Sequence, residues 1–382
     1  MARNVLLLPW LQLSESVFVD GFWFKPLNAD TADTLVGPAM GPVLRKLLKC
    51  YVDFQGRPMD GCTLVTRRNH GAKWDIPRNL WSRVSQATSI LMMSFMSEQR
   101  FYQQLSPHMN ATMFDLVGQG VQENSDGIAL FHRRRGMSLS MGGLKFDGVR
   151  FQRPLEIEHT SCGPFNQKLA RALTRARMSN EILWARITAG IEFFKLGHAE
   201  APQRDWDECC MLSALAFEKL LAPASTPTSV ALSIELAHLL QNHVSIRLKD
   251  AKRVLPDSNP KYRSVQQNWP LHQKWMKELY ELRSATAHHG PRGEFSSNWV
   301  AEQHIVIAAF VFMFALKLIL SQHGFYSLSD EEAGACDAID MLLDSDWGNG
   351  WRRPPEWPNI LSHSEQWRAI RASVELAIAA AG

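Results

Sequence analysis

Residues 163–196 read GPFNQKLARALTRARMSNEILWARITAGIEFFKL, and the chain changes character at this stretch. A glycine and a proline interrupt the preceding pattern, and apolar side chains then recur at helical spacing, among them Leu169, Leu173 and Phe194. The stretch predicts a long helix over Asn166–Leu196 that opens a helical region.

More helical runs follow the first one. Asp205, with Glu208 three residues later, has the pattern of a capping box at the start of the next run. Glycine and proline at 290 and 291 are typical of a helix end. The predicted helices are Asp205–Leu221, Thr228–Leu248, Pro270–His289, Asn298–His323 and Ser362–Ala380. We therefore expect residues 166–382 to form an all-α bundle.

The residues before 166 have a mixed pattern. Short β-branched and aromatic runs predict strands, and two apolar-periodic runs predict helices between them. The predicted strands are Ser16–Phe24, Cys62–Thr66, Gly127–His132 and Leu144–Phe151, and the predicted helices are Met40–Val52 and Asn79–Leu105. The expected architecture is an α+β domain over 1–165, with a sensor or regulatory role, followed by the all-α domain.

Composition excludes two broad classes of protein. The 382 residues are 46% hydrophobic and 21% charged, which excludes a wholly disordered chain. The formal net charge of +3 excludes a chain that is polybasic throughout. That charge is unevenly divided, because residues 166–290 carry 17 basic and 12 acidic side chains and residues 291–382 carry 6 and 12. We expect a local anionic ligand in the middle of the chain, screened by an acidic C-terminal extension.

The most apolar run, Ile305–Leu320, is interrupted only by Lys317. A bilayer needs about 20 apolar residues, so this run predicts a buried helix and no membrane partner. We expect it to pack partly against a second subunit. The six cysteines form no metal-binding pattern and suit a reducing cytoplasm, so neither a metal nor another cofactor is expected.

The segment that suggests chemistry is residues 277–290, KELYELRSATAHHG. Arg283 and His288 are five residues apart near the end of a predicted helix, which places them about 140° apart around its axis. A guanidinium binds phosphate oxygens bidentately, and an imidazole exchanges protons near neutral pH. The pair suits phosphodiester chemistry, although this spacing by itself also arises by chance and at helix ends that carry basic residues.

The context of that pair resembles the R-x4–6-H motif of the HEPN superfamily, in particular its Apea-like branch. The likeness extends to SALAFEKLL at 213–221, to the loop and helix that follow, and to the apolar helix after the motif. It covers about residues 166–325. Two departures are Ser284, where active members often carry Asn, Asp or His, and the doubled His288-His289 before Gly290.

The resemblance implies a metal-independent endoribonuclease that leaves a 2′,3′-cyclic phosphate and usually works as a homodimer. It assigns Arg283 to the charge on phosphorus and His288 to proton transfer, with His289 as its substitute. Supporting residues would be Ser284, Glu218 and Lys219, although a solvated charge pair also explains the last two. Proteins of this type commonly act as toxins or antiphage effectors through abortive infection, with a phage-derived trigger or an antitoxin as partner.

Other interpretations remain open at this point. Arg133, Arg134 and Arg135 follow a predicted strand and suit RNA phosphates, but a solvated turn is the more usual explanation of such a run. The helical domain would alternatively be a non-catalytic HEPN module that binds RNA or a protein partner. A third interpretation is a small-molecule enzyme whose site lies in the first domain.

Overall fold

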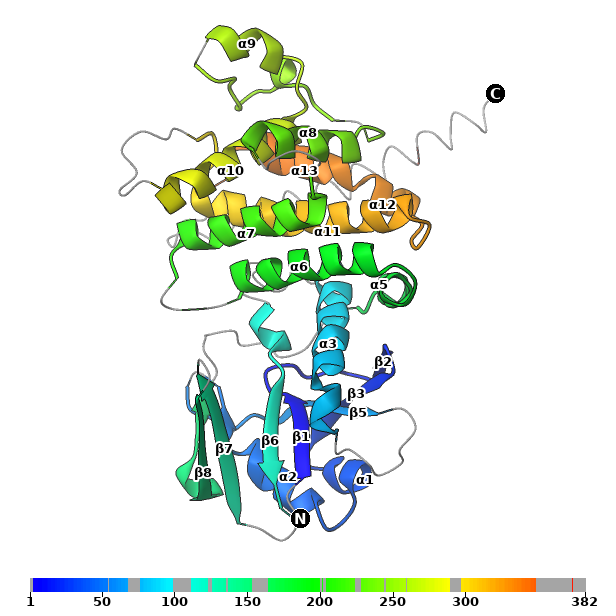
Figure 1. Ribbon diagram of the computed structural model, residues 1–382, viewed down its shortest axis with the longest axis vertical. Coiled ribbons are helices and arrows are strands. Elements are labelled where there is room, and N and C mark those ends of the chain that lie inside the picture. The colour runs from blue at the N-terminus through cyan, green and yellow to red at the C-terminus, as the bar shows by residue number, and fades with distance from the viewer. Residues whose placement is uncertain are drawn as a thin grey trace. The chain divides into compact units, whose positions relative to one another are not determined.

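The computed structural model describes residues 3–53, 55–67, 76–98, 111–122, 126–134, 137–152, 164–199, 201, 204–223, 228–243, 245–258, 260–288, 297–347 and 373 (Figure 1). The chain divides into two compact units, Met1–Thr174 with Ala199–Pro202, and Arg175–His198 with Gln203–Gly382. The first unit contains an antiparallel sheet with helices and the second is helical, as the sequence predicted at this level. The division falls inside a helix, α5 (Gln167–Ser179).

A seven-stranded antiparallel sheet forms the centre of the first unit, with the order β2-β3-β5-β1-β6-β7-β8. Its central strand β1 comes from the N-terminal apolar run, which the sequence analysis did not identify as a strand. The strands are β1 (Arg3–Leu8), β2 (Val17–Val19), β3 (Phe22–Asn28), β5 (Gly61–Arg67), β6 (Val117–Val121), β7 (Gly127–Arg134) and β8 (Met137–Lys145).

The predicted strand over Ser16–Phe24 is in fact a hairpin of β2 and β3. Asp20 and Gly21 form its turn with φ angles of 47° and 90°. Two successive residues with positive φ match the twist of antiparallel strands, and an Asp-Gly pair accepts them at low cost. The aromatic pattern was therefore correct, but the Asp-Gly turn signal within it was overlooked.

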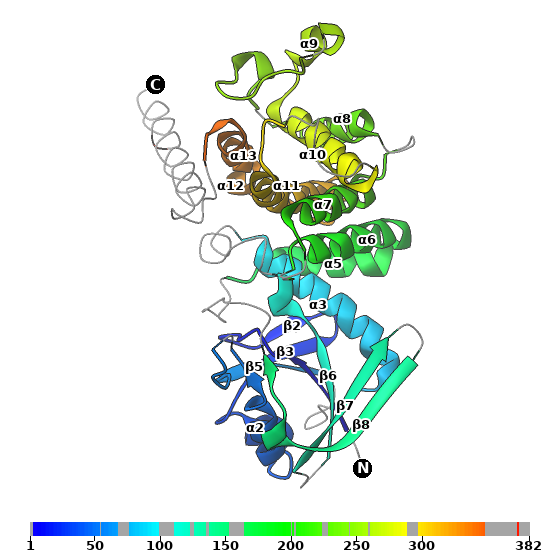
Figure 2. The same cartoon turned by 90° about the vertical axis from the view of Figure 1, so that its left-hand side faces the viewer.

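Helices cover both faces of this sheet (Figure 2). On one face, α2 (Gly41–Leu48) packs Val43, Leu44 and Leu47 into a core with Leu7 and Leu64. Helix α3 (Trp81–Met96) lies on the other face. Gly118 of β6, which pairs with Leu6 of β1, has no side chain and so leaves room for the ring of Trp81. A Cβ on Gly118 would lie 2.6 Å from that ring, so this position requires glycine.

Shorter elements complete the first unit. The predicted helix over Met40–Val52 ends at Leu48, and the chain continues into β4 (Tyr51–Val52), which pairs in parallel with β9 (Phe151–Gln152). The remaining helices are α1 (Ala32–Val36) and three 3-10 turns, Arg78–Leu80, Ala111–Phe114 and Phe146–Gly148. The predicted helix Asn79–Leu105 corresponds to a 3-10 turn followed by α3, which ends at Met96, and its residues 99–105 lie outside the described residues.

The second unit is a set of packed helices. They are α6 (Glu181–Gly197), α7 (Trp206–Leu221), α8 (Ser229–Leu239), α9 (Pro260–Gln266), α10 (Leu271–His288), α11 (Ala301–Gln322), α12 (Asp330–Ala333) and α13 (Ala335–Asp344), with a 3-10 turn at Leu248–Asp250. The predicted helix over Ser362–Ala380 falls almost entirely outside the described residues.

Polar caps set where three of these helices begin. The side chains of Asn180, Asp205 and Thr228 each accept a hydrogen bond from the backbone N–H three residues later. The cap predicted at Asp205 is confirmed. The cap at Asn180 divides the single helix predicted over Asn166–Leu196 into α5 and α6.

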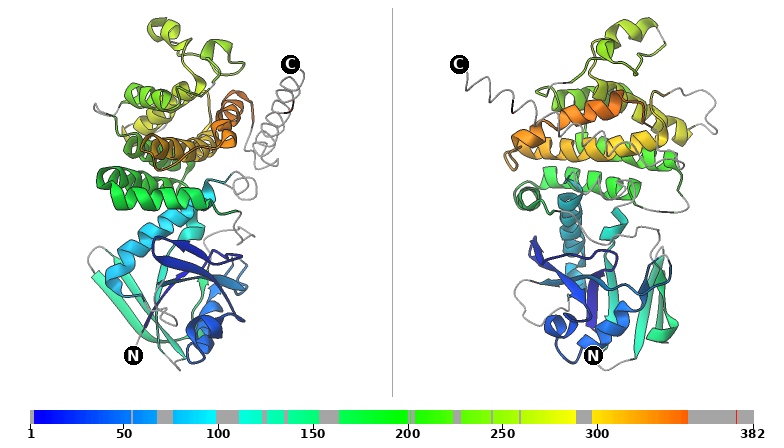
Figure 3. Two further views of the ribbon diagram at one scale, coloured as in Figure 1. Left: turned by 90° about the vertical axis from the view of Figure 1, so that its right-hand side faces the viewer. Right: turned by 180° about the vertical axis from the view of Figure 1, so that it is seen from behind.

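Helix α11 lies at the centre of the second unit, beside α13 (Figure 3). It is the one helix in the described chain that is long and apolar enough to cross a membrane, and 89% of its most apolar stretch is buried inside the protein. Its charged residue Lys317 is also buried and pairs with Glu332 at 2.9 Å. Residues 311–320 are buried within one chain, which leaves little of this helix exposed for the expected subunit contact, and that contact stays a prediction.

Helix α13, in the described part of the acidic C-terminal region, belongs to the folded core. Asp340 accepts hydrogen bonds from Ser245 Oγ and the Ile246 N–H, and Asp344 accepts from the N–H groups of Lys252 and Arg253. These carboxylates hold a distant segment in place. Removing residues 326–382 would therefore unfold part of the unit as well as remove negative charge.

Candidate functional site

Arg283 lies in the last turns of α10, where it faces α7. Its Nη2 is 3.9 Å from Glu218 Oε2, and its guanidinium lies over the ring of Tyr280 with 5.0 Å between Cζ and the ring centroid. The side chain keeps 24% of its exposure. A long ion pair with this much solvent access leaves the guanidinium able to reach an incoming anion.

Glu218 is the group around which this cluster gathers. Besides Arg283, it accepts a 3.4 Å hydrogen bond from the Tyr280 hydroxyl, and Lys219 Nζ lies 3.5 Å from its other carboxylate oxygen. Its side chain is only 13% exposed, whereas that of Lys219 is 44% exposed. The structure thus joins Glu218 to Arg283 across two helices, and Lys219 remains at the surface beside them.

The pKa of the Tyr280 hydroxyl is set by its burial and by the charges of Glu218 and Arg283. Partial burial raises the pKa of its hydroxyl, and the negative charge of Glu218 raises it further, while the positive charge of Arg283 opposes both. The phenol therefore stays protonated at neutral pH and donates to the carboxylate. No residue pattern in the sequence singled out Tyr280.

The structure locates the rest of the motif only in part. Ser284 is half-buried on α10, and the backbone of α10 remains helical through His288. The side chain of His288 and all of His289 lie outside the described residues. Of the three arginines at 133–135, Arg133 and Arg134 are placed in β7 by their backbone pairing with β8, while Arg135 lies outside the description. These arginines belong to the first unit, whereas the motif belongs to the second.

A buried network of charges occupies the first half of α10, which the sequence analysis missed. Lys274, with a side chain 2% exposed, contacts Asp257 and lies 3.1 Å from Glu278, which is 3% exposed. Lys277 continues the network to Asp257 at 3.1 Å and to Glu281 at 2.5 Å. Burial alone would raise the pKa of Asp257, but hydrogen bonds from Lys274 and Gln266 and the lysine charges lower it to about 2. The helical i,i+4 spacing of these pairs is visible in the sequence; their burial is not.

Glu278 connects this network to the chain beyond the motif. Its Oε2 accepts hydrogen bonds of 2.7 Å from both Ser297 Oγ and the Asn298 N–H, and its Oε1 accepts one of 2.6 Å from Asn298 Nδ2. Ser297 Oγ also lies 3.1 Å from Nε2 of the buried His304. The segment that resumes after the motif is therefore fixed to the same helix that carries Arg283.

Residues 245–258 and 260–269, called here the basic arm, precede α10 in sequence and carry several exposed basic side chains. Its sequence holds six basic and two acidic residues. Exposed cations at Arg247, Lys249, Lys252 and Arg263 stand beside exposed Leu255, Tyr262 and Val265. One of the two acidic residues, Asp257, forms ion pairs with Lys274 and Lys277 of α10. The exposed charge of the basic arm is therefore mainly positive. Helix α9 of this arm projects beyond the stacked helices of its unit (Figure 1).

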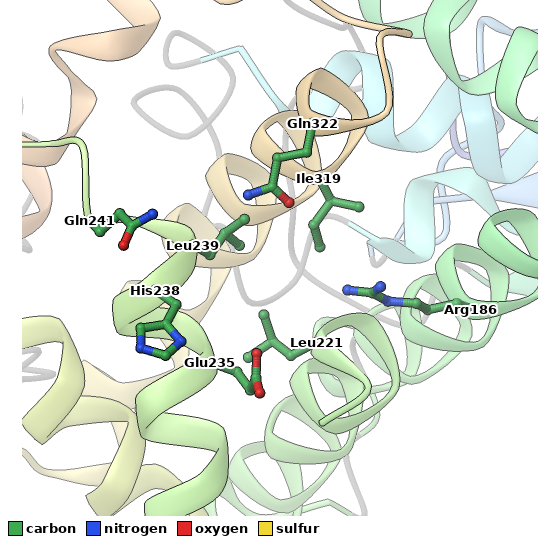
Figure 4. Close-up of a pocket in the computed structure, with 8 residues that line it drawn as sticks. All are labelled: Arg186, Leu221, Glu235, His238, Leu239, Gln241, Ile319 and Gln322. Carbon is green, nitrogen blue, oxygen red and sulfur yellow. The ribbon is translucent and has the colours of Figure 1, made fainter. Parts of the chain in front are cut away.

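A separate pocket opens between the ends of four helices of the same unit (Figure 4). Its volume is about 320 Å³, and none of the motif residues lines it. The lining comes from α6, α7, α8 with the turn that follows it, and α11, through Arg186, Leu221, Glu235, His238, Leu239, Gln241, Ile319 and Gln322.

Comparison with known proteins gives no match: no family model, no curated protein and no solved structure is similar to this chain.

Proposed function

We propose that the helical unit is an endoribonuclease of HEPN type that cleaves RNA without a metal ion. The observation that supports it best is the Glu218–Arg283 contact, 3.9 Å between Oε2 and Nη2, in the late turns of a helix that leads into two successive histidines. The pairing holds a partly exposed guanidinium in a defined position between two helices. The anion-binding group Arg283 thus lies close in sequence to His288 and His289, which can transfer protons.

The roles of the residues follow from their chemistry. Arg283 stabilises the negative charge that develops on the phosphorane, because its fork matches phosphate oxygens. His288, with His289 as its substitute, takes the proton of the 2′-hydroxyl as that oxygen attacks phosphorus, and the imidazolium returns the proton to the 5′-oxygen as the bond from phosphorus to that oxygen breaks. The products are a 2′,3′-cyclic phosphate and a 5′-hydroxyl. Glu218 orients Arg283, and Lys219 and Ser284 add polar contacts at the edge of the site.

The same proposal includes a setting for the activity. A homodimer in the cytoplasm would bring two copies of the motif together, using surfaces other than the buried face of α11. The activity would serve as a toxin or an antiphage effector, released by a phage-derived trigger or by loss of an antitoxin. The first unit would then sense the trigger or restrain the nuclease.

The decisive experiment measures cleavage of labelled single-stranded RNA by the full chain and by Arg283→Ala, His288→Ala and His289→Ala, each with and without EDTA. We expect Arg283→Ala and one histidine variant to lose at least about a hundredfold in rate, since general acid–base groups contribute about 10²–10⁴-fold. EDTA should have no effect, and mass spectrometry should find the cyclic phosphate. Arg204→Ala and His323→Ala serve as controls from the same unit. Cleavage that survives all three motif substitutions contradicts the assignment, and a requirement for Mg²⁺ contradicts the mechanism.

A second candidate is a non-catalytic HEPN module that binds RNA or a protein. The observation in its favour is that the Arg283 guanidinium already contacts both Glu218 and Tyr280, next to the weaker hydrogen-bonding residue Ser284. The same assay separates the two candidates, because a binding module shows a retained RNA complex with no product at any enzyme concentration.

A further inference from the structure

The pocket between α6, α7, α8 and α11 contains two opposite charges that the protein does not pair with each other. Its volume of about 320 Å³ falls in the range typical of small-molecule sites. Within the described part of the chain, no ion pair joins the pocket residues Arg186 and Glu235.

Arg186 is anchored at one atom. Its Nε donates a 2.5 Å hydrogen bond to the carbonyl of Leu220, which is one of the last carbonyls of α7. Close packing of α6 on α7 fixes this geometry, because a Cβ on Gly190 would lie 3.2 Å from Leu220 Cβ. The Nε bond is the one hydrogen bond that Arg186 makes to the described chain, so its two Nη groups, which point into the pocket, have no hydrogen-bond partner among the described residues (Figure 4).

Glu235 comes from α8 and is half-buried at the opposite side of the same cavity (Figure 4). Its carboxylate has neither a hydrogen bond nor an ion pair within the residues that the structure describes. Burial lowers the pKa of Arg186, while the negative charge of Glu235 raises it, so the guanidinium feels the field of this carboxylate. The remaining lining is mixed: Leu221, Leu239 and Ile319 supply an apolar patch, and His238, Gln241 and Gln322 supply polar groups.

We propose that this pocket binds a small zwitterion, an α-amino acid with an aliphatic side chain. Its carboxylate would accept hydrogen bonds from the Nη groups of Arg186, and its ammonium group would donate to Glu235. The side chain would rest on Leu221, Leu239 and Ile319. A phosphate or nucleotide fits less well because Glu235 repels it, and a simple amine fits less well because Arg186 repels it. The inference is independent of the RNA-cleaving activity.

The test is isothermal titration of the full chain with L-leucine. Three probes serve as comparisons: 4-methylpentanoate, which lacks the amine, 3-methylbutylamine, which lacks the carboxylate, and inorganic phosphate. We expect saturable binding of leucine and binding at least about tenfold weaker for every comparison probe, since each loses a charge-assisted contact. Glu235→Gln and Arg186→Gln should each weaken leucine binding by about tenfold or more. The matched controls Glu192→Gln and Arg204→Gln, which remove the same charges from the same unit outside the pocket, should bind leucine as the natural chain does.

Glu235→Gln decides the question, because it keeps the side-chain shape and removes no contact with the described protein. Arg186→Gln also loses the bond to Leu220, so its circular dichroism spectrum must match that of the natural chain before it counts. The proposal is overturned if leucine does not bind the natural chain, if Glu235→Gln binds it unchanged, or if phosphate or either single-charge probe binds as tightly.

Discussion

Glu218 is positioned to compete with a phosphate for the guanidinium of Arg283, since Oε2 and Nη2 are 3.9 Å apart. Glu218→Gln keeps the hydrogen bond from Tyr280 and removes the competing charge. We expect it to bind single-stranded RNA up to about fivefold more tightly, because partly exposed ion pairs are worth about 0.2–1 kcal/mol. Fluorescence anisotropy at fixed salt measures the change, and Glu192→Gln controls for net charge. Weaker binding by Glu218→Gln would contradict the competition with phosphate and leave the carboxylate only its positioning role on Arg283.

Lys274 is the most buried charged residue of the α10 network, and its ammonium group forms ion pairs with both Asp257 and Glu278. Lys274→Met leaves two carboxylates without their shared partner. We expect the free energy of unfolding to fall by about 3–5 kcal/mol, as for other buried pairs from which one member is removed. Urea unfolding measures the loss. The exposed Lys249→Met should change stability by less than about 0.5 kcal/mol, and equal effects of the two substitutions would contradict a structural role for the network.

At the scale of an element, the basic arm has the composition of a surface that binds single-stranded nucleic acid, with cations beside Tyr262. We expect the triple variant Lys249→Gln, Lys252→Gln, Arg263→Gln to weaken RNA binding by about tenfold and to lower the slope of log K against log salt by up to about 2. Anisotropy titrations at several salt concentrations measure both quantities. The matched control is a second triple variant, which removes the same charges from exposed positions of the first unit: Lys49→Gln, Lys145→Gln, Arg171→Gln. Equal salt slopes for the two triples would exclude the arm as the binding surface.

The elements show how far the sequence predicts this fold. Helix α7 was predicted within one residue, because Asp205 signals its start and an apolar period runs through it. The break at Asn180 was missed because apolar periodicity continues across it, although an Asn followed by Glu is itself a start signal. Helix α8 ends at Leu239, nine residues before the predicted end, because the following segment bonds instead to Asp340 and to the chain before α10.

The candidate site was predictable only in its local part. Arg283 and the course of α10 through His288 follow from spacing and helix signals along one segment. The contact between Glu218 and Arg283 depends on how α7 crosses α10, and periodicity carries no information about crossing. Tyr280 and Lys274 were missed for the same reason: one looks like a core aromatic residue and the other like a solvated lysine until the packing is known.

At the scale of the whole molecule, two buried histidines make folding sensitive to pH. Burial lowers the pKa of His272 to about 4 and that of His304 to about 3, from an ordinary value of about 6.5. Between pH 6.5 and 4 the unfolded chain therefore binds protons that the folded chain does not. Stability is complete above pH 6.5 and is lost as pH falls, by about 1.4 kcal/mol per pH unit for each histidine.

Urea unfolding of the full chain between pH 7 and pH 4.5 measures this slope. His304→Gln should make it shallower by about 1.4 kcal/mol per pH unit, whatever its effect on stability at pH 7. A variant whose stability falls with pH as steeply as that of the natural chain would show that His304 is not the group responsible.

Helix α7 carries Glu218, which touches Arg283, and within one turn it carries Leu220 and Leu221, which meet Arg186 and the pocket. Helix α7 therefore contacts the motif through Glu218 and lines the pocket through its C-terminal residue Leu221. If filling the cavity shifts α7, thermodynamic reciprocity fixes the result: the factor by which an amino acid changes RNA affinity equals the factor by which RNA changes amino acid affinity. The same coupling free energy can then be measured from either ligand's binding, and RNA affinity would depend on the concentration of the amino acid in the cell.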